Sequence, residues 1–176
     1  MENTLITNDR LEALVRLCKR TKAETIAEVG VYKGGSLKTL AINFPGAVIL
    51  GFDTFEGLPK EQWNNKEIHK PGEFSDTDIK SVYSFIDRPN VVLIKGLFPE
   101  SAKGYKDQEF DFVHIDTDFY LSVKESLRWF WPRMMYGGII VFDDYKWPNC
   151  PGVERALDEF GQDVHISANY QAYLIK

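Results

Sequence analysis

Four aspartates follow two apolar segments of the sequence, and their positions are the first sign of chemistry. The segments 110–115 and 137–142 are each followed by two of them, Asp116 and Asp118 after the first, Asp143 and Asp144 after the second. Parallel strands joined by a helical crossover end at the same edge of a sheet, so these carboxylates are expected to converge. Clustered carboxylates repel one another unless a bound cation, shared protons or water offsets their charge. The alternative is that they are ordinary loop aspartates that cap helices and face solvent.

The segment between these two strands has the apolar period of a helix. Apolar residues recur at helical spacing over 120–130, and Pro132 closes the segment. Thr117 or Asp118 is expected to cap the start of this helix. His114 shares a face of the first strand with Asp116 because side chains alternate along a strand. It is therefore either a buried core histidine or a support for a neighbouring functional group.

The first expected strand along the chain leads into a glycine-rich turn. The segment 25–31 is a short apolar strand, and Gly30 and Gly34 stand in the turn before a helix over 37–44. Glycine lets a ligand approach the backbone closely, and the amides at the start of the helix, from Gly35 onward, can donate to it. The alternative is a tight turn that serves packing alone.

Two acidic residues narrow the ligand that this turn could bind. The strand 47–52 ends at Asp53, about 20 residues after Gly30, where a Rossmann-like fold places the acid that binds a ribose. Glu28 precedes the turn and would repel a pyrophosphate, but it suits the ammonium group of an adenosyl sulfonium with an amino-acid tail.

The remaining segments complete an α/β pattern. Strands alternating with helices predict a single domain over 1–176, with a mostly parallel sheet, a C-terminal antiparallel hairpin with one reversed edge strand, and helices on both faces. Ligands of such sheets bind at the carboxyl ends of the strands, near the switch in strand order. Further helices are expected at 9–20, which is interpreted as a packing helix, and at 79–86 and 152–160, and further strands at 90–96, 164–168 and 171–176.

A long loop over 54–77 interrupts this pattern. It is rich in glycine, proline and polar residues, and loops of this length near a strand end often act as lids. Its side chains Trp63, His69 and Phe74 could cover a bound acceptor, or they could serve local packing alone.

Composition excludes several classes of protein. Of 176 residues, 44% are hydrophobic and 27% charged, as in an ordinary globular domain. No apolar run approaches the ~20 residues of a membrane span and no signal peptide is recognised, so a cytoplasmic location is expected. The net charge of −5 and the scattered lysines argue against nucleic acid and favour a small-molecule ligand. Cys18 and Cys150 lack the spacing of a zinc or redox motif and are expected to be free thiols.

Six motifs, taken together and in order, resemble the macrocin O-methyltransferase family over most of the chain, from about residue 24 to 160. These enzymes are class I S-adenosylmethionine-dependent methyltransferases, and many of them methylate sugar hydroxyls. The motifs are Glu28-Val-Gly-Val-Tyr-Lys-Gly-Gly-Ser36, Phe52-Asp-Thr-Phe-Glu-Gly-Leu-Pro59, Gly72-Glu-Phe74, Lys95-Gly-Leu-Phe98, His114-Ile-Asp-Thr-Asp-Phe-Tyr120 and Phe142-Asp-Asp-Tyr145.

The resemblance implies a cofactor site and a metal site. Asp53 would hold the ribose hydroxyls of S-adenosylmethionine, and the stretch from Gly96 through Leu97 to Phe98 would lie near the adenine. A divalent cation, magnesium or another hard ion, would be held by Asp116, Asp143 and Asp144, with Asp118 as the candidate base and Asp116 also beside the reacting groups. The methionine end would be lined by Glu28, Gly30, Tyr32, Gly34, Gly35 and Ser36.

That assignment agrees with the chemistry of methyl transfer. A cation bound to vicinal oxygens lowers the pKa of a hydroxyl and orients it toward the sulfonium methyl, and oxygen ligands favour magnesium or calcium. Asp118, two residues after Asp116, is either the base or only a helix cap.

The resemblance departs from the family at one end, and other functions stay open. Members commonly carry a longer N-terminal region, whereas about two dozen residues precede the first strand here. Either a second subunit of a homo-oligomer completes the acceptor site or the acceptor is small. Two alternative functions are a magnesium-dependent phosphohydrolase, suggested by the Asp-x-Asp pair, and a non-catalytic S-adenosylmethionine-binding module.

Overall fold

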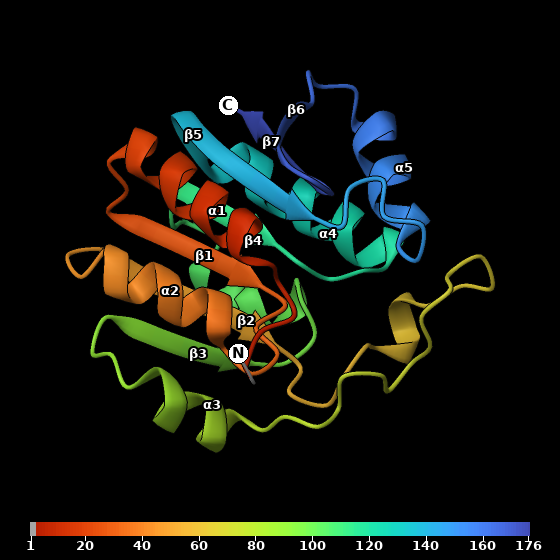
Figure 1. Ribbon diagram of the computed structural model, residues 1–176, viewed down its shortest axis with the longest axis horizontal. Helices are drawn as coiled ribbons and strands as arrows, with labels where there is room; N and C mark the ends of the chain where they lie inside the picture. Colours follow the sequence, from red (N-terminus) through yellow and green to blue (C-terminus); the bar gives the residue numbers. More distant parts are fainter. Residues whose placement is uncertain (1–2) are drawn as a thin grey trace.

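A seven-stranded sheet lies between two layers of helices in the computed structural model, which describes residues 3–176 (Figure 1). The strands are β1 (Thr25–Val29), β2 (Val48–Asp53), β3 (Val91–Lys95), β4 (Phe110–Ile115), β5 (Met134–Asp143), β6 (His165–Ala168) and β7 (Gln171–Ile175). The α-helices are α1 (Asn8–Thr21), α2 (Gly35–Asn43), α3 (Ile79–Ile86), α4 (Tyr120–Phe130) and α5 (Pro151–Phe160). Short 3-10 helices occupy η1 (Lys60–Gln62), η2 (Glu100–Tyr105) and η3 (Trp131–Arg133).

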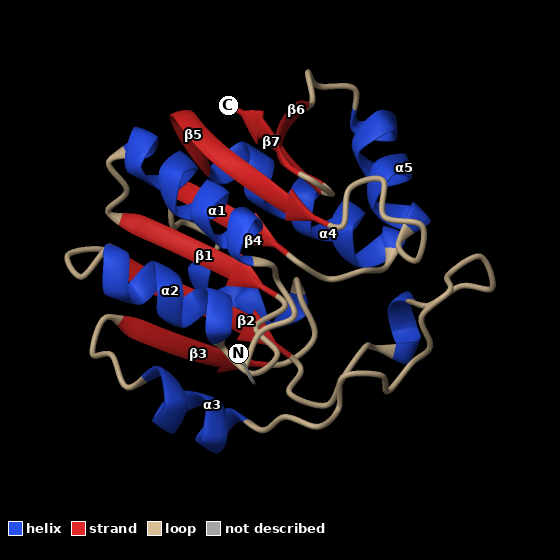
Figure 2. Ribbon diagram, viewed as in Figure 1, coloured by secondary structure: helices blue, strands red, loops and turns tan. Residues whose placement is uncertain are grey.

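The strand order β3-β2-β1-β4-β5-β7-β6 confirms the predicted Rossmann-like sheet. Strands β1 to β5 are parallel, and their arrowheads point the same way in Figure 2. The reversed strand β7 is not itself the edge strand, because β6 pairs with its outer side. The order of strands switches between β1 and β4, so the ends of these two strands border the expected ligand position.

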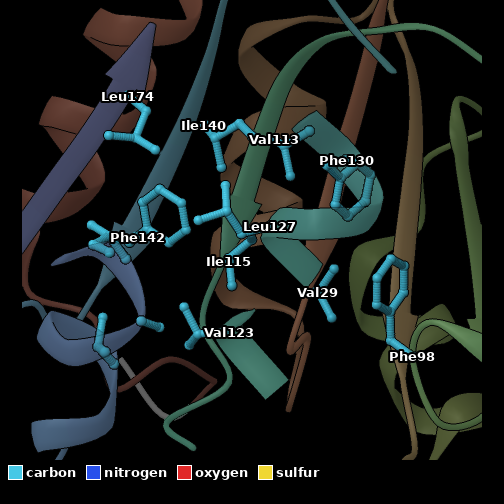
Figure 3. Packing of buried hydrophobic residues seen from close by; sticks show 14 of the residues in the cluster. Val29, Phe98, Val113, Ile115, Val123, Leu127, Phe130, Ile140, Phe142 and Leu174 are labelled. Carbon is cyan, nitrogen blue, oxygen red and sulfur yellow. The ribbon is translucent and has the colours of Figure 1, made fainter. Parts of the chain in front are cut away.

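Each face of the sheet has its own apolar core. Helices α1, α2 and α3 pack on one face, with Leu14, Leu40 and Val82 among their buried side chains. Helices α4 and α5 pack on the other face, where their side chains meet those of β4 and β5 (Figure 3). The side of each helix that its apolar residues predicted is therefore the side that is buried. Burial of each large apolar side chain stabilises the folded protein by roughly 1.5–3 kcal/mol.

Helix α4 is capped from outside its own segment. Its first residue is Tyr120, and neither Thr117 nor Asp118 makes a side-chain capping bond, so the predicted cap was wrong. The Tyr120 amide donates instead to Glu67 Oε1 at 3.1 Å, from the long loop. A carboxylate at this position also interacts favourably with the helix dipole.

The loop between β2 and α3 is held by buried polar side chains. Gln62 is 5% exposed, donates through Nε2 to the Phe98 carbonyl at 3.0 Å, and accepts from Ser122 Oγ at 2.7 Å. Glu67 is also 5% exposed. These contacts tie the loop to α4, so the loop forms a fixed wall in this structure. Among residues 3–176, no helix is long and apolar enough to cross a membrane.

Candidate functional site

A cavity of about 320 Å³ lies at the carboxyl ends of the parallel strands. Its wall is formed by the N-terminal segment 3–6, the glycine turn, the ends of β2 and β4, the long loop and the residues after β5. This is the position that the switch in strand order predicts for a ligand. The polar lining includes Asp53, His69, Asp116, Thr117, Asp118 and Asp144.

Three aspartates converge in this wall. Asp116, Asp118 and Asp144 can each offer a carboxylate oxygen within 4.8 Å of the others. Burial, and then repulsion from the neighbouring carboxylates, raises the pKa of Asp116 well above its usual range and raises that of Asp144. Burial and the Asp144 charge raise the pKa of Asp118 to about 6. The group is thus short of positive charge at neutral pH.

Asp143 lies in a second group of possible ligand atoms, with His114 and Asp116, and its role as a metal ligand stays a prediction. Its side chain is buried, and it does not line the cavity. Asp143 Oδ1 accepts from Arg10 Nη1 and from Gln171 Nε2, both at 3.2 Å, and Oδ2 lies 2.9 Å from His114 Nε2. Of the implied ligands Asp116, Asp143 and Asp144, only the first and last face the cavity.

His114 links the two buried carboxylates of the sheet. Its Nδ1 lies 3.1 Å from Glu28 Oε2, and both side chains are fully buried. Burial opposes a charged ring, but the hydrogen bonds to Asp143 and Glu28 outweigh it and raise the pKa of His114 well above its usual value. His114 is thus a buried core histidine whose two ring nitrogens contact the carboxylates of Glu28 and Asp143.

Glu28 does not reach the ligand directly. It is fully buried, accepts from Ser36 Oγ at 2.8 Å as well as contacting His114, and does not line the cavity. The expected contact of Glu28 with the ammonium of a cofactor stays a prediction. Glu28 instead positions Ser36, which does line the cavity.

The glycine turn is shaped by protein contacts as well as by any ligand. A Cβ at Gly30 would lie 1.8 Å from the Asp116 carbonyl oxygen, and a Cβ at Gly34 would meet Val82 at 3.0 Å. Gly30 lines the cavity but Gly34 does not. Both positions therefore need glycine for packing, and at Gly30 this need coexists with a place on the cavity wall.

The first amide of α2 is already bonded. Gly35 N donates to the Asn3 carbonyl at 2.9 Å, and both residues line the cavity. The amide expected to be free for a ligand is thus occupied by the N-terminal segment in this structure. Tyr32 and Ser36 remain on the wall as predicted.

Asp53 organises the cofactor side of the cavity. Its Oδ2 accepts from the amides of Val31 and Tyr32 at 2.7 and 2.8 Å, and its Oδ1 accepts from Phe55 N at 2.6 Å. The carboxylate fixes the glycine turn against the end of β2, and it lines the cavity, as a ribose contact requires.

The residues after β3 border the cavity. Gly96, Leu97 and Phe98 line the cavity. The Phe98 ring is packed in the core, stacked on Phe130 with ring centroids 5.2 Å apart.

The long loop and the segment after β5 both reach Asp118. His69, Asp118 and Cys150 can bring one ligand atom each within 4.8 Å of the others, and Cys150 Sγ donates to Asp118 Oδ1 at 3.3 Å. Both cysteines are free, as expected. His69 and Phe74 line the cavity, as the covering role predicts, while Trp63 donates to the His69 carbonyl at 3.2 Å and does not line it.

Sequence reasoning missed Arg10, which belongs to the helix interpreted as a packing helix. Its side chain is 12% exposed and lines the cavity, and its Nη1 contacts Asp143 and also Asp144 Oδ1, the latter at 3.0 Å. Burial opposes its charge, but Asp143 and Asp144 raise its pKa. An arginine at the polar end of an amphipathic helix carries no pattern that distinguishes it from a surface residue.

The oxygens of Asp116, Asp118 and Asp144 fit a hard divalent cation by their chemistry. Their close approach and raised pKa values indicate a need for positive charge. Thr117 Oγ1, in the same wall, is buried without a hydrogen-bond partner among residues 3–176, so the wall also has a polar atom to offer an incoming ligand.

The sheet order, the glycine turn and the cavity at the strand ends define a Rossmann-like class I methyltransferase fold. The structure of the O-methyltransferase NovP is similar over 99% of this chain and 82% of that chain, with a TM-score of 0.81 and 19% identity. An O-methyltransferase from Bacillus cereus in complex with SAH is similar over 99% of this chain and 85% of that chain, with a TM-score of 0.68 and 15% identity.

The model of the family Macrocin-O-methyltransferase (TylF) matches residues 1–172, and the chain belongs to this family. A Streptomyces olivaceus protein, 8-demethyl-8-(2,3-dimethoxy-alpha-L-rhamnosyl)-tetracenomycin-C 4'-O-methyltransferase, is 23% identical over 141 residues. That match covers 71% of this chain and 54% of the relative, so the chain spans about half the length of this curated relative. The predicted family is confirmed.

Proposed function

We propose that this protein is an S-adenosylmethionine-dependent O-methyltransferase acting on a hydroxyl of a sugar or another small metabolite. Family membership and the fold support the methyl donor, and the tetracenomycin relative, named for a rhamnosyl substrate, supports a sugar acceptor. One observation carries the proposal. The carboxylate of Asp118 faces a cavity at the switch in strand order, together with the glycine turn and Asp53.

Methyl transfer here requires three tasks of the chain. The backbone from Gly30 to Ser36 and Asp53 would hold the donor at the strand ends, and the loop wall would exclude water. Asp118 would accept the proton of the acceptor hydroxyl. At the same time, the hydroxyl oxygen of the acceptor would form a bond to the methyl carbon of the donor, and the bond between that carbon and the sulfur would break. The products are the methyl ether, S-adenosylhomocysteine and a protonated Asp118. A pKa of about 6 suits a base at neutral pH.

A divalent cation would be held by Asp116 and Asp144 beside Asp118. Bound there, it would lower the pKa of the acceptor hydroxyl and orient its oxygen. Asp143 would support this group indirectly, since His114 and Arg10 already occupy its oxygens.

Calorimetric titration with S-adenosylmethionine and S-adenosylhomocysteine tests the donor. Binding of both is expected, and no binding of either at about 1 mM would overturn the proposal. Transfer of a labelled methyl group to L-rhamnosides then tests the acceptor class. The Asp118→Asn variant should bind both nucleosides and lose transfer. Binding without transfer to any hydroxyl acceptor, by the wild type, would favour a non-catalytic binding module.

A further inference from the structure

The guanidinium of Arg10 already occupies the cation-binding side of the carboxylate cluster. Nη1 of Arg10 lies 3.2 Å from Asp143 Oδ1 and 3.0 Å from Asp144 Oδ1, so one nitrogen bridges two adjacent carboxylates. Asp144 is also one of the three cavity-facing residues that fit a divalent ion. The Asp144 carboxylate can therefore bind either the Arg10 guanidinium or a divalent ion.

Arg10 is held in this position by the sheet. Gln171 of β7 donates through Nε2 both to the Arg10 carbonyl at 3.3 Å and to Asp143 Oδ1 at 3.2 Å. Arg10 Nε donates to Thr7 Oγ1 at 3.4 Å, just before α1 begins. One amide thus connects the start of α1 to the carboxylate that Arg10 binds, so the contact is built into the packing of α1 on the sheet.

Positive charge near the cluster is scarce. Asp143 is shared between Arg10 and His114, and Asp144 forms an ion pair with Arg10 alone among residues 3–176. Asp116 and Asp118 form no ion pair within the same described range. Removal of Arg10 would leave Asp144 with its two neighbours and no cation, which is a strong site for a hard divalent ion.

A divalent ion and the guanidinium cannot both contact Asp144 closely, because like charges a few ångströms apart repel strongly in a partly buried site. We propose that Arg10 is an internal competitor for the divalent cation, so that an ion binds Asp116 and Asp144, beside Asp118, only as Arg10 leaves Asp144. The start of α1 then sets the affinity of the site for metal. This competition refines the cation of the proposed function, and it can be measured without donor or acceptor.

The test is a Mn²⁺ titration followed by electron paramagnetic resonance of the free ion. Arg10→Gln removes the charge and keeps a polar side chain, and it should bind one Mn²⁺ with a Kd at least tenfold lower than wild type. Arg10→Lys keeps a positive charge and should stay within about threefold of wild type. Arg16→Gln is the matched control on α1, since Arg16 is exposed and donates to the Ser167 carbonyl, away from the aspartates, and it should not differ from wild type.

A second measurement uses the wild type alone, in case Arg10→Gln does not fold. Mg²⁺ is titrated while the arginine side-chain ¹H–¹⁵N signals are followed by NMR, and the Arg10 signal should shift as the ion saturates the site. Equal Mn²⁺ affinity of wild type and Arg10→Gln, or no binding by either, would overturn the competition. Saturation by Mg²⁺ with an unchanged Arg10 signal would do so as well. Neither the Mn²⁺ affinity nor the Arg10 signal depends on methyl transfer, so a failure of the proposed function would leave both measurements unchanged.

Discussion

Asp118 combines the features of a base at the level of a single residue. It faces the cavity, its backbone φ is +58°, and Cys150 donates to one of its oxygens. It makes no side-chain capping bond at the start of α4. Asp118 thus has a strained backbone conformation and does not stabilise α4 as a cap. Function explains its position more readily than stability does.

Asp118→Asn should therefore separate activity from stability. We expect methyl transfer to fall by about 100-fold or more, because the amide cannot accept the proton. Binding of S-adenosylhomocysteine should stay within about threefold, as measured by calorimetry. The control is Asp158→Asn, which changes an exposed carboxylate on α5 and should leave both quantities unchanged. Loss of nucleoside binding in Asp118→Asn would assign the residue to the cofactor site instead.

The pKa of Asp118 also predicts how stability depends on pH. Its value is about 6 in the folded protein against 3.8 for an ordinary aspartate, so the folded state binds this proton more tightly. The stability that this residue contributes is complete below pH ~4 and is lost as the pH rises through about 6. His114, whose pKa is also raised, acts in the same direction at higher pH.

In metal-free buffer, the melting temperature should thus fall between pH 5 and pH 8. Asp118→Asn should show a shallower fall and melt several degrees above wild type at pH 8, which differential scanning calorimetry can measure. Identical slopes for the two proteins would show that Asp118 does not titrate in this range.

The residue types of the site could be predicted from the sequence, but their directions could not. The aspartates after β4 and β5 were recognisable because acids follow apolar strands. Asp143 and Asp144 are adjacent, yet one faces the buried histidine and the other faces the cavity. Which of two neighbours turns inward depends on partners such as Arg10 and Gln171, from distant segments.

At the level of elements, the long loop and α4 depend on each other. Glu67 caps α4 from 53 positions earlier in the chain, and Gln62 joins the loop to Ser122 on that helix. The helices and strands themselves followed from apolar periodicity, because each buries one side. The cap could not be foreseen, since capping rules consider only residues next to the helix.

Glu67→Ala should test this connection. Loss of the capping carboxylate is expected to cost about 1–2 kcal/mol of unfolding free energy, measured by urea denaturation. The loop should also become more sensitive to limited proteolysis, because one of its contacts with α4 is lost. Glu67→Gln retains an acceptor oxygen and should lose less. Glu61→Ala, an exposed change in the same loop, should have no effect. Equal proteolysis of Glu67→Ala and wild type would show that the loop is fixed by its other contacts, such as that of Gln62 with Ser122.

At the level of the whole molecule, the cavity lies where the strand order reverses between the parallel neighbours β1 and β4. Gly30 follows β1 and Asp116 follows β4, and their backbones are in contact at this point. The alternation of strands and helices was sufficient to predict a parallel sheet with its ligand at the switch. It could not show that Gly30 serves the contact with Asp116 as much as the approach of a ligand.

Gly30→Ala should consequently disturb the junction between the two halves of the sheet. A Cβ there would lie 1.8 Å from the Asp116 carbonyl oxygen, and Gly30 also has a φ of +89°, which L-residues rarely adopt. Gly161→Ala is the matched control, because Gly161 has a φ of +74° with nothing within 4 Å of its Cβ position. Gly161→Ala should lose about 1 kcal/mol from the backbone alone. Gly30→Ala should lose at least twice as much in urea denaturation and should weaken nucleoside binding, because the Asp116 backbone must move. Equal losses in the two variants would mean that backbone conformation, rather than the β1–β4 contact, requires glycine at position 30.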